Sequence, residues 1–83
     1  MPMDKKDQLA ELISNAETSF YNGQLQEAFS LSLSAIKLDE NCADAYQYAA
    51  NVCMSLSRYE DAIEYYQKVQ IYIMLITQIE MNL

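Results

Sequence analysis

The side chains that could carry covalent or acid–base chemistry in this 83-residue chain are two cysteines and a set of carboxylates. Cys42 and Cys53 are too far apart for a C-x-x-C metal or redox pair, and Cys53 falls on the apolar face of a predicted helix. The chain contains no histidine, which removes the commonest general base and metal ligand. Glu60, Asp61 and Glu64 lie on the exterior of a predicted helix as solvated charge. We therefore expect no catalytic activity, no bound metal and no cofactor.

Composition indicates one small acidic domain. Five basic residues against twelve acidic ones give a formal net charge of −7. Acidic surfaces repel nucleic acid, so we expect no nucleic-acid partner, whereas a basic or mostly apolar protein partner is compatible with this charge. The absence of a stapling cysteine pattern favours a reducing, cytoplasmic compartment. The start of the chain does not resemble a secretory signal, and the longest apolar run, 71–76, is too short for a bilayer, so no membrane partner is expected.

Helical periodicity runs through nearly the whole chain and predicts four helices. The first begins near Asp4 or Asp7 and ends at Asn22-Gly23, where both residues tolerate a left-handed backbone. The second covers about 24–38 and passes through an alternating Ser/Leu stretch at 30–34. The apolar face of the third is expected to contain Tyr46, Ala49, Ala50, Cys53, Met54 and Leu56. That of the fourth is expected to contain Tyr59, Ala62, Ile63, Tyr66, Val69 and Ile73.

Two capping motifs predict where the last two helices begin. The motif Asn41-x-x-Asp44 resembles a capping box for the third helix, with Asp in place of the usual Glu or Gln. The motif Ser57-x-x-Glu60 is a full capping box and predicts that the fourth helix begins at Arg58.

Two stretches, 23–41 and 57–74, match each other at an offset of 34 residues. Small residues fall on small ones, as Ala16 on Ala50 and Ala28 on Ala62. A fixed period of about 34 residues that spans two helices is typical of a helical-hairpin repeat. The predicted fold is all-α, with antiparallel helical hairpins stacked as a short α-solenoid and with turns at 22–23, 40–42 and 56–57. Ala28 and Ala62 should be buried where helices cross most closely.

On these residues the chain resembles the tetratricopeptide repeat family. The family's large, small and aromatic positions are filled by Tyr46, Ala50, Tyr59, Ala62, Tyr66 and Val69 in the second repeat, and by Leu12, Ala16, Gly23, Leu25, Ala28 and Ala35 in the first. Glu40 stands where the family has a closing proline. The resemblance divides the chain into a lead-in (1–8), two repeats (9–42 and 43–76) and an extension of the last helix (77–83).

The resemblance also implies a concave binding groove formed by the first helix of each repeat. Its candidate partner-binding residues are Ile13, Glu17, Tyr21, Asp44, Gln47, Tyr48 and Asn51. Phe20 and Met54 are expected to pack between helices instead, whereas Tyr48 and Asn51 should be exposed. Some family members grip a peptide's terminal carboxylate with Lys, Asn and Arg, but those slots here hold Ile13, Glu17 and Tyr48. We therefore expect no recognition of a carboxylate terminus.

The repeat pattern breaks after Val69, and in 70–83 only Glu80 is charged and no Gly or Pro occurs. Its spacing fits a helix or a strand, and continuity with the fourth helix favours a helix. As a helix it either caps the stack or docks on another chain, and a third interpretation is that the chain is a shortened product of a longer repeat protein. The candidate contacts of this tail are Tyr72, Ile73, Ile76, Ile79 and Leu83.

These patterns together predict a non-enzymatic protein–protein interaction module, a scaffold or adaptor of the tetratricopeptide type. A protein or peptide would bind in the concave groove, on the tail, or on both. The alternative is a small structural subunit, or a shortened product of a larger repeat protein, built into a multiprotein assembly. Two repeats fall below the three or so that give a stable stack, so self-association or membership of a larger complex is expected.

Overall fold

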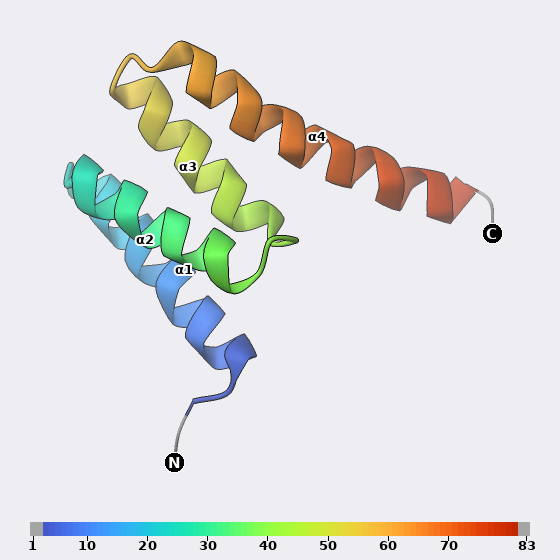
Figure 1. Cartoon of the computed structure of the whole chain (residues 1–83), viewed down its shortest axis with the longest axis horizontal. Coiled ribbons are helices and arrows are strands. Elements are labelled where there is room, and N and C mark those ends of the chain that lie inside the picture. Colours follow the sequence, from blue (N-terminus) through green and yellow to red (C-terminus); the bar gives the residue numbers. More distant parts are fainter. Residues whose placement is uncertain (1–2, 82–83) are drawn as a thin grey trace.

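Four α-helices make up the computed structural model of the protein, which describes residues 3–81. The helices are α1 (Lys5–Tyr21), α2 (Leu25–Leu38), α3 (Ala43–Ser55) and α4 (Tyr59–Met81), and these residues contain no strand. The prediction of an all-α chain is confirmed. Helices α1 and α2 form one antiparallel hairpin, α3 and α4 form a second, and α2 packs against α3 to join them (Figure 1).

The first helix begins as its residue types predict. Asp4 is the N-cap of α1, and its Oδ1 accepts a hydrogen bond of 2.8 Å from the N–H of Asp7. The alternating Ser/Leu stretch lies within α2, as expected from the continuous apolar stripe. There Ser32 is fully buried, and its hydroxyl donates a bond of 2.8 Å to the carbonyl of Ala28. A buried serine is tolerated in α2 because its hydroxyl is satisfied within the helix.

The turns that close the two hairpins have the same geometry at an offset of 34 residues. In each turn, the two residues after the C-cap donate N–H bonds back to the last turn of the helix. After α1, the N–H groups of Gly23 and Gln24 donate to the carbonyls of Phe20 (3.1 Å) and Ser19 (2.8 Å). After α3, the N–H groups of Ser57 and Arg58 donate to the carbonyls of Met54 (3.1 Å) and Cys53 (2.8 Å). This is the Schellman motif, which requires a left-handed residue. Gly23 (φ 79°) and Ser57 (φ 60°) supply it.

This geometry overturns the capping box predicted at Ser57. A residue with positive φ that closes α3 cannot also be the extended N-cap of the next helix. The N-cap position therefore passes to Arg58, whose carbonyl accepts the N–H of Ala62 at 3.0 Å, and α4 begins at Tyr59.

The capping box predicted at Asn41 and Asp44 is also wrong. Helix α3 begins at Ala43 after an extended Cys42, and no side chain caps it. Asn41 instead belongs to the α2–α3 loop, where its N–H donates to Oδ1 of Asp39 at 3.0 Å. The loop hydrogen bond takes the place of the cap.

Alanine dominates the core. Fully buried alanines occur on all four helices, namely Ala16, Ala28, Ala35, Ala45, Ala49, Ala50 and Ala62. Small side chains allow helix axes to approach closely. The predictions that Ala28 and Ala62 are buried and that Cys53 lies on a buried face are confirmed. Val52 and Cys53 are the largest fully buried apolar side chains, so the core contributes little apolar area per residue.

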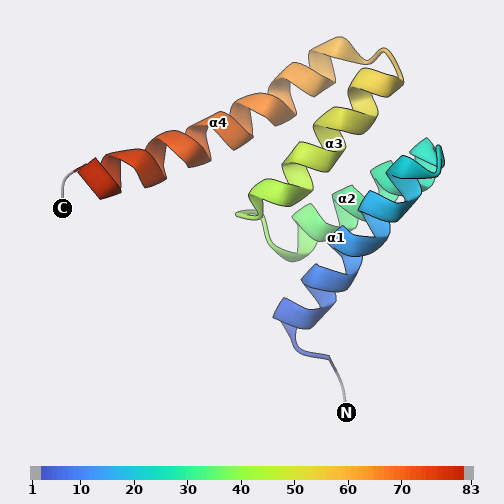
Figure 2. The same cartoon turned by 180° about the vertical axis from the view of Figure 1, so that it is seen from behind.

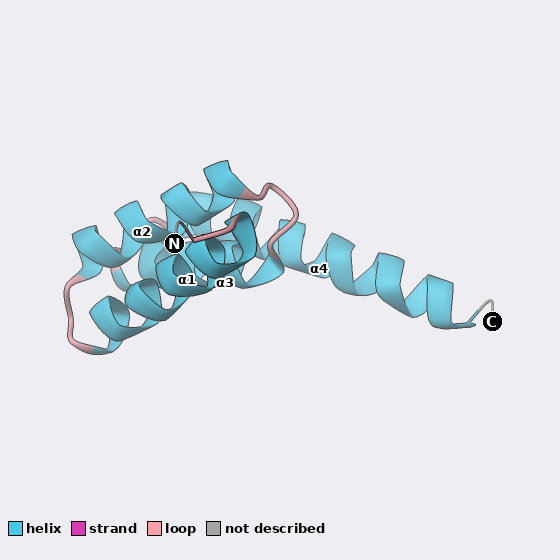
Figure 3. Cartoon of the chain, turned by 90° about the horizontal axis from the view of Figure 1, so that it is seen from below, coloured by secondary structure: helices cyan, strands magenta, loops and turns pink. Residues whose placement is uncertain are grey.

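Helix α4 extends well past the rest of the molecule. Its 23 residues span about 34 Å, whereas the 13 residues of α3, against which it packs, span about 20 Å. Its last turns project away from the other helices (Figures 2 and 3). The radius of gyration, 13.7 Å, accordingly exceeds the value of about 12 Å expected for a compact domain of this length. The described part of the tail is helical, as predicted.

Within residues 3–81, no helix combines the length and the apolar character that crossing a membrane requires.

Candidate functional site

The projecting part of α4 is an apolar segment without cover. We call residues 71–79 the α4 overhang. Its large aliphatic side chains are each more than half exposed: Ile71, Ile73, Met74, Leu75, Ile76 and Ile79. No charged residue occurs from 69 to 79. Because these side chains lie on every side of the helix, the overhang differs from the one-sided stripe of an ordinary surface helix.

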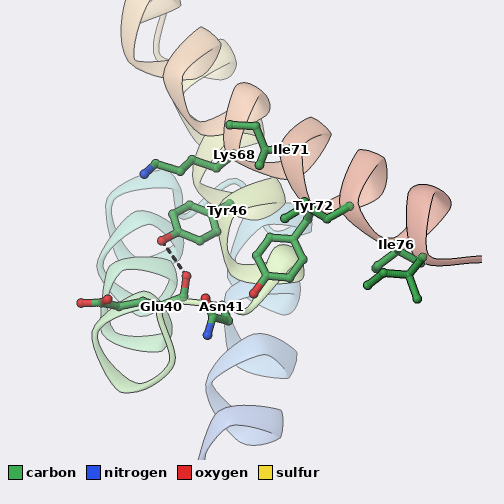
Figure 4. A pocket seen from close by; sticks show the side chains of 9 residues that line it. Glu40, Asn41, Tyr46, Lys68, Ile71, Tyr72 and Ile76 are labelled. Carbon is green, nitrogen blue, oxygen red and sulfur yellow. Dashed lines mark hydrogen bonds between the residues drawn. The ribbon is translucent and has the colours of Figure 1, made fainter. Parts of the chain in front are cut away.

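An open groove of about 580 Å³ runs along one side of the overhang. The α4 wall of the groove consists of Lys68, Ile71, Tyr72, Leu75, Ile76 and Ile79. The opposite wall consists of Tyr46, near the start of α3, and of Glu40 and Asn41 in the α2–α3 loop. The ring of Tyr72 reaches toward this loop (Figure 4).

Hydrogen bonding and aromatic packing hold the wall opposite α4 in place. The hydroxyl of Tyr46 donates to the carbonyl of Glu40 at 2.9 Å. Tyr65 of α4 packs between Tyr46 and Phe29, with ring centroids 6.3 and 6.4 Å away, so α2, α3 and α4 meet in one aromatic cluster. Burial, followed by the charge of Glu40, raises the pKa of Tyr46 above its ordinary value, so its hydroxyl remains a donor. The wall of the groove opposite α4 is thus held in place before a partner binds.

Four of the residues predicted for the concave groove gather between α1 and α3. Burial raises the pKa of Tyr48 to about 12, with a further contribution from the neighbouring Glu17 carboxylate and smaller ones from Tyr21 and Asp44. Tyr48 is half-buried, whereas Tyr21, Glu17 and Asp44 are exposed. The carboxylates of Glu17 and Asp44 thus lie near the phenol of Tyr48, and this patch is acidic and aromatic.

The pKa of Tyr48 makes stability depend on alkaline pH. The neutral phenol is favoured in the folded chain, so its stabilising contribution is complete below pH 10 and is lost as the pH rises through about 12. We expect the free energy of unfolding to fall across this window, and the fall to be smaller in Tyr48→Phe. Urea denaturation at several pH values measures this, with Tyr59→Phe on the exposed start of α4 as control. If the free energy of unfolding fell with pH as steeply in Tyr48→Phe as in the wild-type chain, the raised pKa of Tyr48 would be contradicted.

Gln47 and Asn51 face a different neighbour from the four concave-face residues. The Oδ1 of Asn51 accepts bonds from the hydroxyl of Tyr66 (2.7 Å) and from Nε2 of Gln47 (3.2 Å). These amides therefore tie α3 to α4, and both residues are half-buried. Ile13 is also half-buried.

Two expectations about apolar side chains need correction. Met54, expected to pack between helices, is 46% exposed, whereas Phe20 is half-buried. On α4, Tyr59, Ile63 and Ile73 were expected on the packed face but are more than half exposed. Ile73 lies in the part of α4 that extends past α3, and within the described residues no further helix follows α4 to cover Tyr59 and Ile63.

Only some of the tail residues predicted from the sequence line the groove. Tyr72, Ile76 and Ile79 line the groove, and Ile73 lies outside it. Leu83 lies outside the described residues. Tyr46, Ile71 and Leu75 were not identified from the sequence as groove residues. Ile71 and Leu75 could have been identified, because they precede Ile79 at helical i, i+4 steps.

Neither cysteine lines the groove. Cys53 is fully buried, and burial raises the pKa of its thiol. A thiol in this state is inert at neutral pH and acts as a small core side chain. Cys42 is half-buried in the α2–α3 connection.

No protein-family model, curated protein or solved structure matches this chain.

Proposed function

We propose that this chain is a non-enzymatic protein–protein interaction module of the tetratricopeptide type, and that it binds another protein chain through the open side of α4. The observation that carries the proposal is the α4 overhang, where six large apolar side chains are more than half exposed. Contiguous apolar patches of this kind usually mark interaction surfaces. The repeated hairpin geometry supports the assignment to a helical repeat.

The 34-residue offset explains why this side of α4 is open. Phe29 on α2 is half-buried, because the second hairpin packs over it and Tyr65 contacts its ring. Ile63, the equivalent residue on α4, is 54% exposed. A stack of helical hairpins buries such a face by adding another helix. A partner helix would supply the missing cover.

The chemistry of the groove favours binding over catalysis. Its lining is mainly aliphatic and aromatic, with Lys68 and Glu40 at its borders. Among the described residues, no serine, threonine or cysteine lines the groove as a nucleophile, and the chain has no histidine, the commonest general base. Aromatic and aliphatic side chains around a pre-formed groove are typical of interface centres.

A second candidate surface is the concave face of α1 and α3. Tyr21 is 75% exposed there, beside Tyr48 and Glu17, and exposed tyrosines often anchor peptides. The exposed carboxylates of Glu17 and Asp44 would select a basic or neutral segment and repel an acidic peptide terminus. The alternative role, as a small subunit of a larger assembly, uses the α4 side alone.

Affinity capture with the full chain tests the proposal. We expect wild-type chain to retain one or more proteins, which mass spectrometry identifies, and Ile71→Lys/Ile79→Lys to lose them. Tyr21→Lys on the concave face is the matched control and should retain them. Circular dichroism checks that each variant keeps its helicity. If the overhang variant retained every partner and the concave variant lost them, the binding surface would be the concave face. A wild-type chain that retained neither another protein nor an untagged copy of itself would contradict the function.

A further inference from the structure

We propose that the partner of the α4 overhang is the same helix of a second copy, packed antiparallel about a two-fold axis near Leu75. Each overhang then occupies the groove of the other copy, so each site is complete only in the dimer. This inference rests on the proposed function, since it identifies the chain that the open side of α4 binds. Four observations on the described residues carry it.

The first observation excludes head-to-tail stacking of copies. In α3, Ala45, Ala49 and Val52 are fully buried. The equivalent residues of α1, 34 positions earlier, are Glu11, Asn15 and Thr18, and all three are exposed. Helix α3 packs against α2, whereas no helix precedes α1 within the described residues.

That comparison limits how a second copy can dock. If α1 of another copy packed on α4 as α3 packs on α2, the side chains of Glu11 and Asn15 would be buried against apolar residues without partners, which is costly. The α1 end of the stack is thus a polar cap, and the α4 end is apolar. A closed two-fold contact of α4 on α4 avoids this cost, because it brings the apolar ends of the two copies together.

The second observation is charge. Each copy carries a formal charge of −7, so a contact between copies that included acidic residues would be repulsive. The segment 69–79 contains no charged residue, although the chain as a whole is strongly acidic. Two such segments can meet without bringing like charges together. Contact between copies through the acidic parts of the surface would be opposed by charge repulsion.

The third observation is the spacing of the groove residues on α4. Ile71, Leu75 and Ile79 line the groove at steps of four. In an antiparallel pair centred on Leu75, Ile71 lies opposite the partner's Ile79, and Leu75 lies opposite its own copy. A surface that is related to itself by this two-fold operation is self-complementary, as an isologous interface requires.

The fourth observation is area. Four of the side chains that are more than half exposed also line the groove, namely Ile71, Leu75, Ile76 and Ile79, and they present on the order of 400 Å² of surface per copy. A two-fold contact would therefore remove on the order of 800 Å² from the two overhangs alone, close to the size of about 1,000 Å² at which specific protein interfaces begin. The fixed wall of Tyr46, Glu40 and Asn41 adds contact area on the other side of the inserted helix (Figure 4).

Sedimentation velocity over a concentration series, with complementary charge variants of Leu75, tests the inference. Wild-type chain should sediment as a dimer at micromolar concentration. Leu75→Glu and Leu75→Lys should each dissociate at least tenfold more readily, because like charges meet at the two-fold axis. An equimolar mixture of the two variants should recover dimers, since Glu and Lys then face each other. Tyr21→Glu on α1 is the control and should remain dimeric, and circular dichroism verifies the helicity of every variant.

Each contrary outcome has a defined meaning. Dimers that persist in both Leu75 variants, or a mixture that stays monomeric, would overturn the two-fold α4 pairing. A wild-type monomer at every concentration would overturn the inference while leaving the proposed function intact, provided that affinity capture still finds a partner lost on substitution of Ile71 and Ile79. If capture also found none, both would be contradicted.

Discussion

Replacing Ala62 with leucine is expected to lower the free energy of unfolding by about 1–3 kcal/mol. Ala62 is fully buried on α4, which packs against α3. Three added heavy atoms have no space there without separating the two helices or straining rotamers. Ala28 occupies the equivalent position on α2 and is also fully buried, so Ala28→Leu should have a similar effect.

Urea denaturation followed by circular dichroism measures both changes. Ala10→Leu on the exposed side of α1 is the matched control, because the same atoms are added in solvent, and it should change stability by less than about 0.5 kcal/mol. If Ala62→Leu unfolded at the same urea concentration as Ala10→Leu, the close packing of α3 and α4 would be wrong.

Replacing Ser57 with glycine is expected to raise the free energy of unfolding by about 1 kcal/mol. Ser57 has a φ of 60°, a left-handed conformation that its Cβ disfavours. Glycine adopts this conformation without strain and completes the same Schellman turn at Gly23. The reciprocal change, Gly23→Ser, should lower stability by about 1 kcal/mol. No atom lies within 4 Å of a Cβ built at Gly23, so this cost comes from backbone strain and not from a clash.

The sign of the change separates this explanation from a general effect of glycine. Ser30→Gly, at an exposed position within α2, is the control and should lower stability by about 0.5 kcal/mol. A destabilising Ser57→Gly would show that the left-handed turn after α3 is not formed in solution.

Local signals in the sequence were sufficient for the helices and for the burial of the alanines. The i, i+3, i+4 spacing persists through the serine-rich part of α2, and Asn22-Gly23 has the backbone freedom that its turn requires. The capping boxes failed because a motif does not specify which of two helices it serves. At Ser57 the end of α3 and the start of α4 compete for one residue, and closing α3 takes precedence.

The candidate site was predictable only in part. Its apolar, uncharged segment is evident in the sequence, but the groove also depends on Tyr46 and the α2–α3 loop, which lie 25 or more residues before Ile71. Such a non-local pairing depends on where α4 crosses α3. The resemblance to the repeat family predicts that Asn51 and Tyr48 lie on the same concave face. In the structure, the side chain of Asn51 instead accepts a hydrogen bond from the hydroxyl of Tyr66 on α4.

Amide hydrogen exchange of the full chain, free and in its associated form, tests most directly the claim that the open side of α4 is the binding surface. Our account predicts that association slows exchange in 71–79 and in the facing segment 40–46, while 10–21 on α1 exchanges at the same rate in both forms. Slower exchange confined to 13–21 and 44–51, with 71–79 unchanged, would contradict it and assign binding to the concave face.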